Sequence, residues 1–268
     1  MDHFLNGRTA LVTGSVQGIG LAIGAALAGA GARIAVHGLA DEDQRRSAVE
    51  HMLLSGAPEA RFFEADLRDP DAIDRMVDAV SAWGVPDIVV NNAGIQKTVS
   101  LADATRQVWD DIIAINLSAP FHVMRRLMPG MGERGYGRVI NVASVHGLVG
   151  SVNKSPYVSA KFGLVGLSRA AALEYAALGD RERGGITVNC ICPGFSETEL
   201  IEPQILARAA EIGGDRDAGV ASILSEKQPS KRLSRPEEIA ALALWLANPL
   251  AHNLTGTAIP IDGGWTAQ

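Results

Sequence analysis

The chain has 268 residues, and its 47% hydrophobic and 20% charged fractions allow a sizeable apolar core. Its net charge of −6 offers no basic stripe for nucleic acid. No apolar run approaches the roughly 18 residues that a membrane helix needs, and the N-terminus lacks a basic, apolar secretion signal. We therefore expect neither nucleic acid nor a membrane as a partner.

Apolar, strand-like runs alternate with helical periodicity along most of the chain. The runs predict strands at residues 9–13, 33–37, 61–65, 87–91, 138–143, 187–192 and 258–261. The periodicity predicts helices that include residues 20–30, 41–55, 70–83, 157–178 and 236–247. Near-continuous apolar strands separated by helices are typical of a parallel sheet covered on both faces. The prediction is an α/β fold, a single Rossmann-type, doubly wound domain over residues 1–268.

Residues 196–235 interrupt this alternation after the sixth predicted strand. They carry helical pieces, the pair Gly213-Gly214 and several charges. A long insertion at this point is typical of a lid over a binding site. We predict a substrate lid here.

The only cysteines, Cys190 and Cys192, lie two residues apart in an apolar run. A disulfide between such near neighbours on a strand would be strained. We expect two buried free thiols in a cytoplasmic protein, because thiols persist in reducing compartments. The sequence has no His, Cys and carboxylate cluster for a catalytic metal.

A glycine-rich turn, residues 13–20, follows the first predicted strand directly. Gly14 permits a tight turn, Gly18 lets the backbone approach a pyrophosphate, and Gly20 lets the next helix pack closely. The N-terminus of that helix presents free N–H groups to an anion. This turn predicts a dinucleotide site.

The residues near this turn favour NAD over NADP. A 2′-phosphate usually needs an arginine or lysine at the turn or at the end of the second strand. Those places hold Gln17 and the His-Gly-Leu run that ends at Leu39, and the next basic residue is Arg45. The usual acidic residue for the ribose is also absent there, since Asp41 comes a few residues late.

Tyr157 and Lys161 begin a predicted helix, and their i, i+4 spacing places them on one helix face. A free tyrosine, with a pKa of about 10, is a poor base near neutrality. A lysine about 4 Å away would supply much of the roughly 3–4 kcal/mol needed to lower that pKa by about 2–3 units. Ser144 follows the fifth predicted strand, at the sheet edge where ligands of open parallel sheets bind. These residues predict acid–base chemistry on an alcohol.

Together with Asp66-Leu67, the Asn91–Gly94 turn, Asn116 and Pro193-Gly194, these motifs resemble the short-chain dehydrogenase/reductase family over essentially the whole chain. The resemblance implies four catalytic residues: Tyr157 as acid/base, Ser144 on the reacting oxygen, Lys161 lowering the tyrosine pKa, and Asn116 in a water relay. It also implies that Asp66 contacts adenine, Asn92 the adenosine-side ribose region, and Lys161 the nicotinamide ribose. The cofactor residues expected in all are Gly14, Gln17, Gly18, Ile19, Gly20, Leu39, Asp66, Leu67, Asn92, Ala93, Gly94, Tyr157, Lys161, Pro193, Gly194 and Thr198.

Four polar residues, Gln96, His146, Lys154 and Gln204, are expected around this pocket. A lysine with two amides and an imidazole suits a small carboxylate, with the charged pair as the strongest contact. Residues 91–96, 144–149, 153–155, 226–230 and 262–268 are similar to the D-3-hydroxybutyrate dehydrogenase subfamily. That resemblance implies oxidation of D-3-hydroxybutyrate with NAD, these four residues on the carboxylate, Ser144 and Tyr157 on the alcohol, Trp265 in the pocket wall or supplied by a neighbouring subunit, and a homotetramer.

The sequence also departs from that subfamily. Phe195 stands where a tryptophan is usual, and the lid carries Glu197, Glu199 and Glu202. These carboxylates would repel an anionic substrate if they faced it, and would be harmless if they faced solvent. Another small hydroxy acid, a polyol or a cyclic alcohol therefore stays open as the substrate. A catalytically silent, dinucleotide-sensing module is the alternative from another class of protein.

Overall fold

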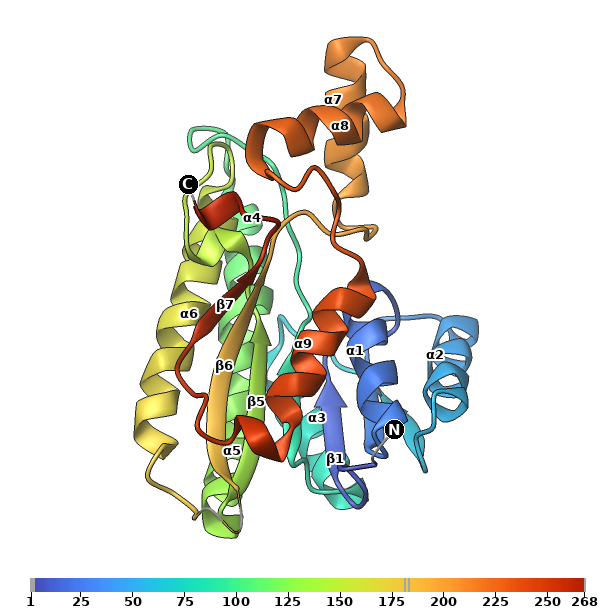
Figure 1. The fold of residues 1–268 in the computed structure, drawn as a ribbon, viewed down its shortest axis with the longest axis vertical. Helices are drawn as coiled ribbons and strands as arrows, with labels where there is room; N and C mark the ends of the chain where they lie inside the picture. The colour runs from blue at the N-terminus through green and yellow to red at the C-terminus, as the bar shows by residue number, and fades with distance from the viewer. Residues whose placement is uncertain (1–2, 181, 183, 268) are drawn as a thin grey trace.

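A computed structural model describes residues 3–180, 182 and 184–267. Its centre is a seven-stranded sheet in the order β3-β2-β1-β4-β5-β6-β7, with every neighbouring pair parallel (Figure 1). The predicted doubly wound α/β fold is confirmed. The strands are β1 (Thr9–Val12), β2 (Arg33–His37), β3 (Ala60–Phe63), β4 (Ile88–Asn91), β5 (Tyr136–Val142), β6 (Gly185–Pro193) and β7 (Ala258–Ile261).

Helices cover both faces of the sheet because successive side chains of a buried strand point in opposite directions. In β1, Ala10 and Val12 join the core beneath one helical layer, while Leu11 joins the core beneath the other. The first layer is α1 (Gly18–Gly29), α2 (Glu42–Leu54) and α9 (Pro236–Ala247). The second is α3 (Pro70–Trp83), α5 (Ala119–Arg134) and α6 (Ser155–Tyr175).

The largest difference from the prediction lies between β4 and β5, where no helix was named. The structure has α4 (Arg106–Ile113), a π-helical turn (Ala114–Ser118) and α5 in continuous succession. Two prolines obscure this helix in the sequence. Pro120 is tolerated in the first turn of α5, and Pro129 lies inside that helix.

The segment predicted as a lid, called the lid segment or lid below, contains α7 (Glu202–Ile212) and α8 (Arg216–Lys227), which stand above the carboxyl ends of the strands (Figure 1). The two helices have a small core of their own, formed by Ile201, Ile205, Ile223 and Leu224. An isolated parallel bridge between Ser196 and Ser234 joins the two chain segments that enter and leave the lid. The lid is therefore a packed unit, and the two segments that connect it to the sheet are hydrogen-bonded to each other.

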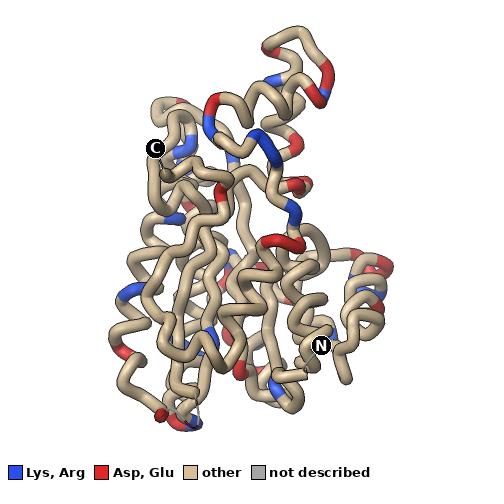
Figure 2. Tube along the Cα trace, viewed as in Figure 1, with Lys and Arg blue, Asp and Glu red and all other residues tan. Residues whose placement is uncertain are grey.

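Charged residues of both signs are interspersed over the body and the lid (Figure 2). Among the residues that the structure describes, no helix has the length and apolar character required to cross a membrane. The same part of the chain has no group of three His, Cys, Asp or Glu residues placed to hold a metal ion. Cys190 and Cys192 are buried and free, as predicted.

Candidate active site

A cavity of about 1010 Å³ lies between the carboxyl ends of the strands and the lid. Every predicted cofactor residue except Gly20 lines it, as does every predicted substrate residue. Of the four predicted catalytic residues, Asn116 alone does not line it. The lid segment contributes the glutamates of the wall with Gln204 and Arg216, and most of the other lining residues come from the loops that follow the strands. The fold thus brings the separate sequence motifs to one place.

The glycine turn has the shape that a pyrophosphate cradle requires. Gly14 and Gly18 have φ of +63° and +55°, a region that favours glycine. A Cβ on Gly14 would lie 2.9 Å from the Cα of Ala93, and a Cβ on Gly20 would lie 2.2 Å from the carbonyl oxygen of Gly14. Helix α1 starts within the turn at Gly18, so its free N–H groups face this region. The residues fit a dinucleotide.

We expect a Gly20→Ala substitution to weaken NADH binding by about tenfold or more. The added methyl group must displace the Gly14 carbonyl, and overpacking of this kind costs roughly 1–3 kcal/mol. Gly29→Ala at the other end of α1 is the matched control, because its Cβ would come no closer than 3.4 Å to a neighbour. Titration of NADH by protein fluorescence checks both. Equal NADH affinity of the two variants would contradict a pyrophosphate site at this glycine turn.

Two arginines lie near the adenosine end, and each has an acidic partner. Arg68, which was not among the predicted site residues, lines the cavity and donates to both carboxylate oxygens of Asp66, at 3.0 and 2.6 Å. This contact lowers the pKa of the Asp66 carboxyl. Arg45 pairs with Glu64 at 2.8 Å. Leu39 is 59% exposed at the cavity edge. The positive charge that a 2′-phosphate would need is therefore already neutralised at these two arginines.

Tyr157 and Lys161 lie on the buried face of α6, close to Ser144. The Lys161 Nζ donates a hydrogen bond to the Val142 carbonyl at 2.8 Å and lies 5.6 Å from the centroid of the Tyr157 ring. The Ser144 Oγ accepts from the backbone N–H of His146 at 3.1 Å. Only 6% of Tyr157 is exposed. The predicted helix-face pairing of the phenol and the ammonium is present.

The pKa values of this pair differ from the expectation. Burial raises the pKa of Tyr157 to about 12, although a hydrogen bond from Ser144 opposes the rise. Burial also lowers the pKa of Lys161 to about 8. A lysine with this pKa is still mostly charged at pH 7, so the rise at Tyr157 comes from desolvation of the phenolate and not from loss of the lysine charge. The tyrosine is held protonated, which suits a general acid.

Asn116 lies in the π-helical turn and is fully buried. Its Nδ2 donates to the carbonyls of Ile95 and Ile112 at 2.9 and 3.0 Å, whereas its Oδ1 is buried without a partner. A Cβ on Gly94 would lie 2.6 Å from this Oδ1 and 3.7 Å from the Lys161 Nζ. The orphaned oxygen is therefore directed toward the Lys161 side of the site, where a polar group would satisfy it.

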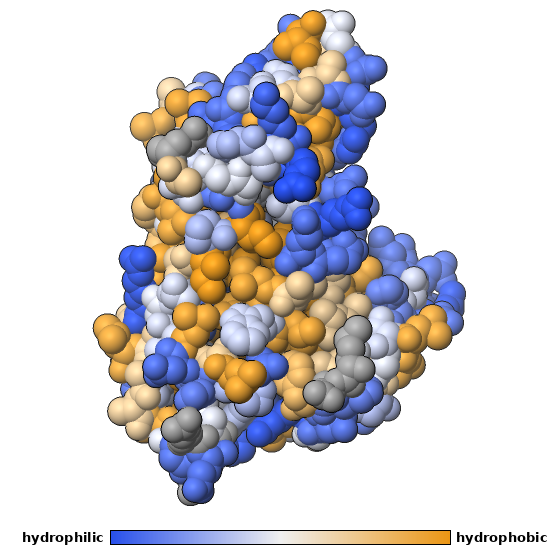
Figure 3. All heavy atoms as spheres, in the orientation of Figure 1, coloured by the Kyte–Doolittle hydropathy of each residue, from blue (hydrophilic) through white to orange (hydrophobic). Residues whose placement is uncertain are grey.

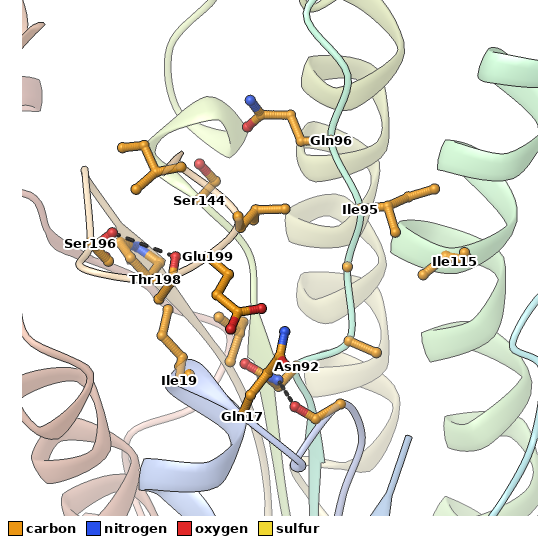
Figure 4. Close-up of a pocket in the computed structure, with 18 of the residues that line it drawn as sticks. Gln17, Ile19, Asn92, Ile95, Gln96, Ile115, Ser144, Ser196, Thr198 and Glu199 are labelled. Carbon is orange, nitrogen blue, oxygen red and sulfur yellow. Dashed lines mark hydrogen bonds between the residues drawn. The ribbon is translucent and has the colours of Figure 1, made fainter. Parts of the chain in front are cut away.

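The opposite end of the cavity contains a buried cation with a neutral partner. The Lys154 Nζ donates to the Gln204 Oε1 of the lid at 2.7 Å, and only 8% of Lys154 is exposed. Burial lowers the pKa of Lys154 to about 8 and, with the nearby lysine charge, that of His146 to about 4. The His146 Nδ1 is buried without a partner. Gln96 faces the cavity near Ser144 (Figure 4).

Aromatic rings close this end of the cavity from within the chain. The Trp265 ring stands edge-on to His146 at 5.4 Å between centroids and tilts against Phe195 at 4.9 Å. Trp265 therefore walls the cavity of its own chain. Of the C-terminal segment singled out in the sequence, Gln268 lies outside the described residues.

The lid carboxylates have different surroundings. Glu202 pairs with Arg216 through two hydrogen bonds, at 2.8 and 2.9 Å, which lowers the pKa of the Glu202 carboxyl. Glu199 extends toward Gln17 and Asn92, on the glycine-turn side of the cavity (Figure 4). The Arg216 guanidinium thus offsets the negative charge of Glu202, which weakens its repulsion of an anion at the Lys154 end.

These features define a Rossmann-type oxidoreductase with a dinucleotide cradle and a tyrosine–lysine–serine site. A family model described as "Enoyl-(Acyl carrier protein) reductase" matches residues 14–266. The chain is 42% identical over 262 residues to the D-beta-hydroxybutyrate dehydrogenase of Rhizobium meliloti, covering 97% of this chain and 99% of that protein. It is 43% identical over 265 residues to the protein of the same name from Cupriavidus necator, covering 98% and 100%.

Among solved structures, an actinorhodin polyketide ketoreductase with NADPH has a TM-score of 0.89 at 32% identity, with 100% of both chains covered. The family match spans nearly the whole chain, and so do the relatives. The chain belongs to the short-chain dehydrogenase/reductase family.

Proposed function

We propose that this protein oxidises D-3-hydroxybutyrate to acetoacetate with NAD, in a reversible reaction. The observation that carries this proposal is the Lys154 ammonium, which is buried beside His146 and whose hydrogen-bond partner among the described residues is the neutral Gln204 amide. A buried cation without a counter-ion is costly, and a substrate carboxylate would relieve that cost. The names of the two relatives at 42% and 43% identity support the same substrate.

In the oxidation, Tyr157 first gives up its own proton to solvent, and its phenolate then takes the proton of the C3 hydroxyl while Ser144 holds the same oxygen. The carbon–hydrogen bond at C3 breaks with its electron pair, and the carbon–oxygen double bond forms. A bound dinucleotide would supply the acceptor for that hydride. In the reverse direction the protonated Tyr157, favoured by a pKa of about 12, returns the proton to the carbonyl oxygen. Gln96 and His146 would orient the carboxylate through hydrogen bonds.

The choice of NAD rests on the two arginine–carboxylate pairs near the adenosine end, Arg68 with Asp66 and Arg45 with Glu64. Recruiting either arginine to a 2′-phosphate would break an existing pair. NAD would leave both pairs intact, because its adenosine ribose carries a 2′-hydroxyl group in place of the phosphate.

A substrate panel with NAD and NADP tests the proposal. We expect NADH formation with D-3-hydroxybutyrate, with a kcat/KM at least about tenfold above that for its L enantiomer, gluconate or cyclohexanol. NADP should support less than about a tenth of the NAD rate. Faster turnover of an uncharged polyol or cyclic alcohol would overturn the substrate and leave the family chemistry intact.

We also propose a cytoplasmic homotetramer. Large apolar side chains are exposed on α4, α5 and α6, at Trp109, Phe121, Phe162 and Leu173. Apolar surface also gathers over β6, β7 and α9 (Figure 3), where Trp245 is 48% exposed. Two separate apolar faces suit an assembly with two kinds of interface. Light scattering should give four times the mass of the chain, and a monomer would contradict this.

A further inference from the structure

His37 is the last residue of β2 and lines the cavity at its adenosine end. In the sequence, this position stands out only because it lacks an acidic residue for the ribose. In the structure His37 is just 2% exposed. A buried imidazole is unfavourable unless its ring nitrogens have hydrogen-bond partners, so the partners of His37 indicate its role.

Both ring nitrogens of His37 have backbone partners. The Nδ1 accepts a hydrogen bond from the N–H of Gly14 at 3.2 Å. Because Nδ1 accepts, the neutral ring carries its proton on Nε2, which then donates to the Ala65 carbonyl at 3.2 Å. Burial lowers the pKa of His37 to about 4, which agrees with a neutral ring. The ring therefore has no polar atom left for a ligand.

These bonds join three segments that meet at the cofactor site. Gly14 belongs to the pyrophosphate turn after β1, and Ala65 precedes Asp66 after β3. The backbone of His37 adds two bonds to the turn: the Ser15 N–H donates to its carbonyl at 2.8 Å, and its own N–H donates to the Ser15 Oγ at 3.1 Å. One side chain thus couples the turn that faces the pyrophosphate to the segment that faces the adenine.

We infer that His37 is a positioning residue for dinucleotide binding, which acts by holding the Gly14 turn and the Ala65–Asp66 segment in register. This inference rests on the cofactor site proposed above. The Asn92 Nδ2 donates to the carbonyls of Thr13 and Gly14 at 3.0 Å, so the carbonyl side of the turn is held by Asn92 and the Gly14 N–H by His37. Loss of the His37 acceptor would leave this half-buried N–H without that hydrogen bond and would loosen the turn on the His37 side.

Two matched substitutions separate the hydrogen bond from the bulk of the ring. Asn and Leu have nearly the same shape, and the Oδ1 of an asparagine can take the place of Nδ1 as acceptor. We expect the NADH dissociation constant of His37→Leu to rise at least about tenfold, and that of His37→Asn to stay within about threefold of the unmodified protein. In both variants kcat at saturating NAD and the KM for the alcohol should change less than about twofold.

Direct titration of NADH by fluorescence, without any alcohol present, is the deciding measurement. Equal NADH affinity of the Leu and Asn variants would overturn the inference, and so would a fall in kcat with unchanged affinity. If His37→Leu does not fold, His37→Gln replaces it, because its longer amide reaches the Nε2 position and not Nδ1. It should bind NADH more weakly than His37→Asn, and equal binding would again overturn the inference. If the protein binds NADH but does not oxidise D-3-hydroxybutyrate, the proposed substrate is wrong, and the test of His37 by NADH titration is unaffected.

Discussion

Tyr157→Phe should reduce kcat for D-3-hydroxybutyrate oxidation by roughly a thousandfold and leave NADH affinity within about threefold. The substitution removes one hydroxyl from a ring that is only 6% exposed, so the cavity keeps its shape. General acid–base catalysis contributes about 10²- to 10⁴-fold, and that contribution is lost in full when the proton acceptor is deleted. Steady-state rates of NADH formation, with NADH binding measured separately, check both parts of the prediction.

Tyr175→Phe is the matched control because Tyr175 ends the same helix, α6, away from the cavity. It should keep the full rate. If Tyr157→Phe keeps more than about a tenth of the activity, the hydroxyl is not the acid or base, and the proton must move through another group.

Lys154→Ala should lower kcat/KM for D-3-hydroxybutyrate by about 30- to 150-fold, mainly through KM. A hydrogen bond to a charged group contributes about 2–3 kcal/mol in a buried site, which corresponds to that factor. The pH dependence gives an independent signature. With its pKa lowered to about 8, Lys154 is charged below that pH and loses its charge above it. The KM of the unmodified protein should therefore rise as pH passes 8, by about tenfold per pH unit.

The control for this substitution is Lys97→Ala, because Lys97 is exposed, lies next to Gln96 and does not line the cavity. It should leave both KM and its pH profile unchanged. A neutral isostere, 3-hydroxybutyramide, completes the test. The unmodified protein should prefer the acid by about a hundredfold, and Lys154→Ala should lose most of that preference. Equal use of acid and amide by the unmodified protein would refute the carboxylate site.

The strands, helices and glycine turn could be predicted from the sequence because each of these features depends on a short stretch of residues. Continuous apolar runs predicted the strands, and the glycine spacing at Gly14, Gly18 and Gly20 predicted the turn that the structure contains. The i, i+4 spacing of Tyr157 and Lys161 likewise fixed their common helix face. Parallel strands bring their carboxyl ends to one edge, so residues after different strands were expected to meet there.

The properties that depend on long-range contacts could not be predicted in this way. The position of Arg68 at the cavity, paired with Asp66, was not predictable because it depends on how the loop after β3 folds. The direction of the Tyr157 pKa depends on the burial of the phenol, which outweighs a lysine that is itself desolvated. The role of Glu202 depends on Arg216, which reaches it from the other lid helix.

The most direct test of the proposed reaction is to follow the hydrogen at C3. D-3-hydroxybutyrate carrying deuterium at C3 should yield NADH that contains one deuterium at C4 of its nicotinamide ring, together with unlabelled acetoacetate, as read by mass spectrometry. The Tyr157→Phe variant should form almost none of this product. Unlabelled NADH, or no NADH at all from this alcohol under conditions where the protein binds NAD, would contradict the account.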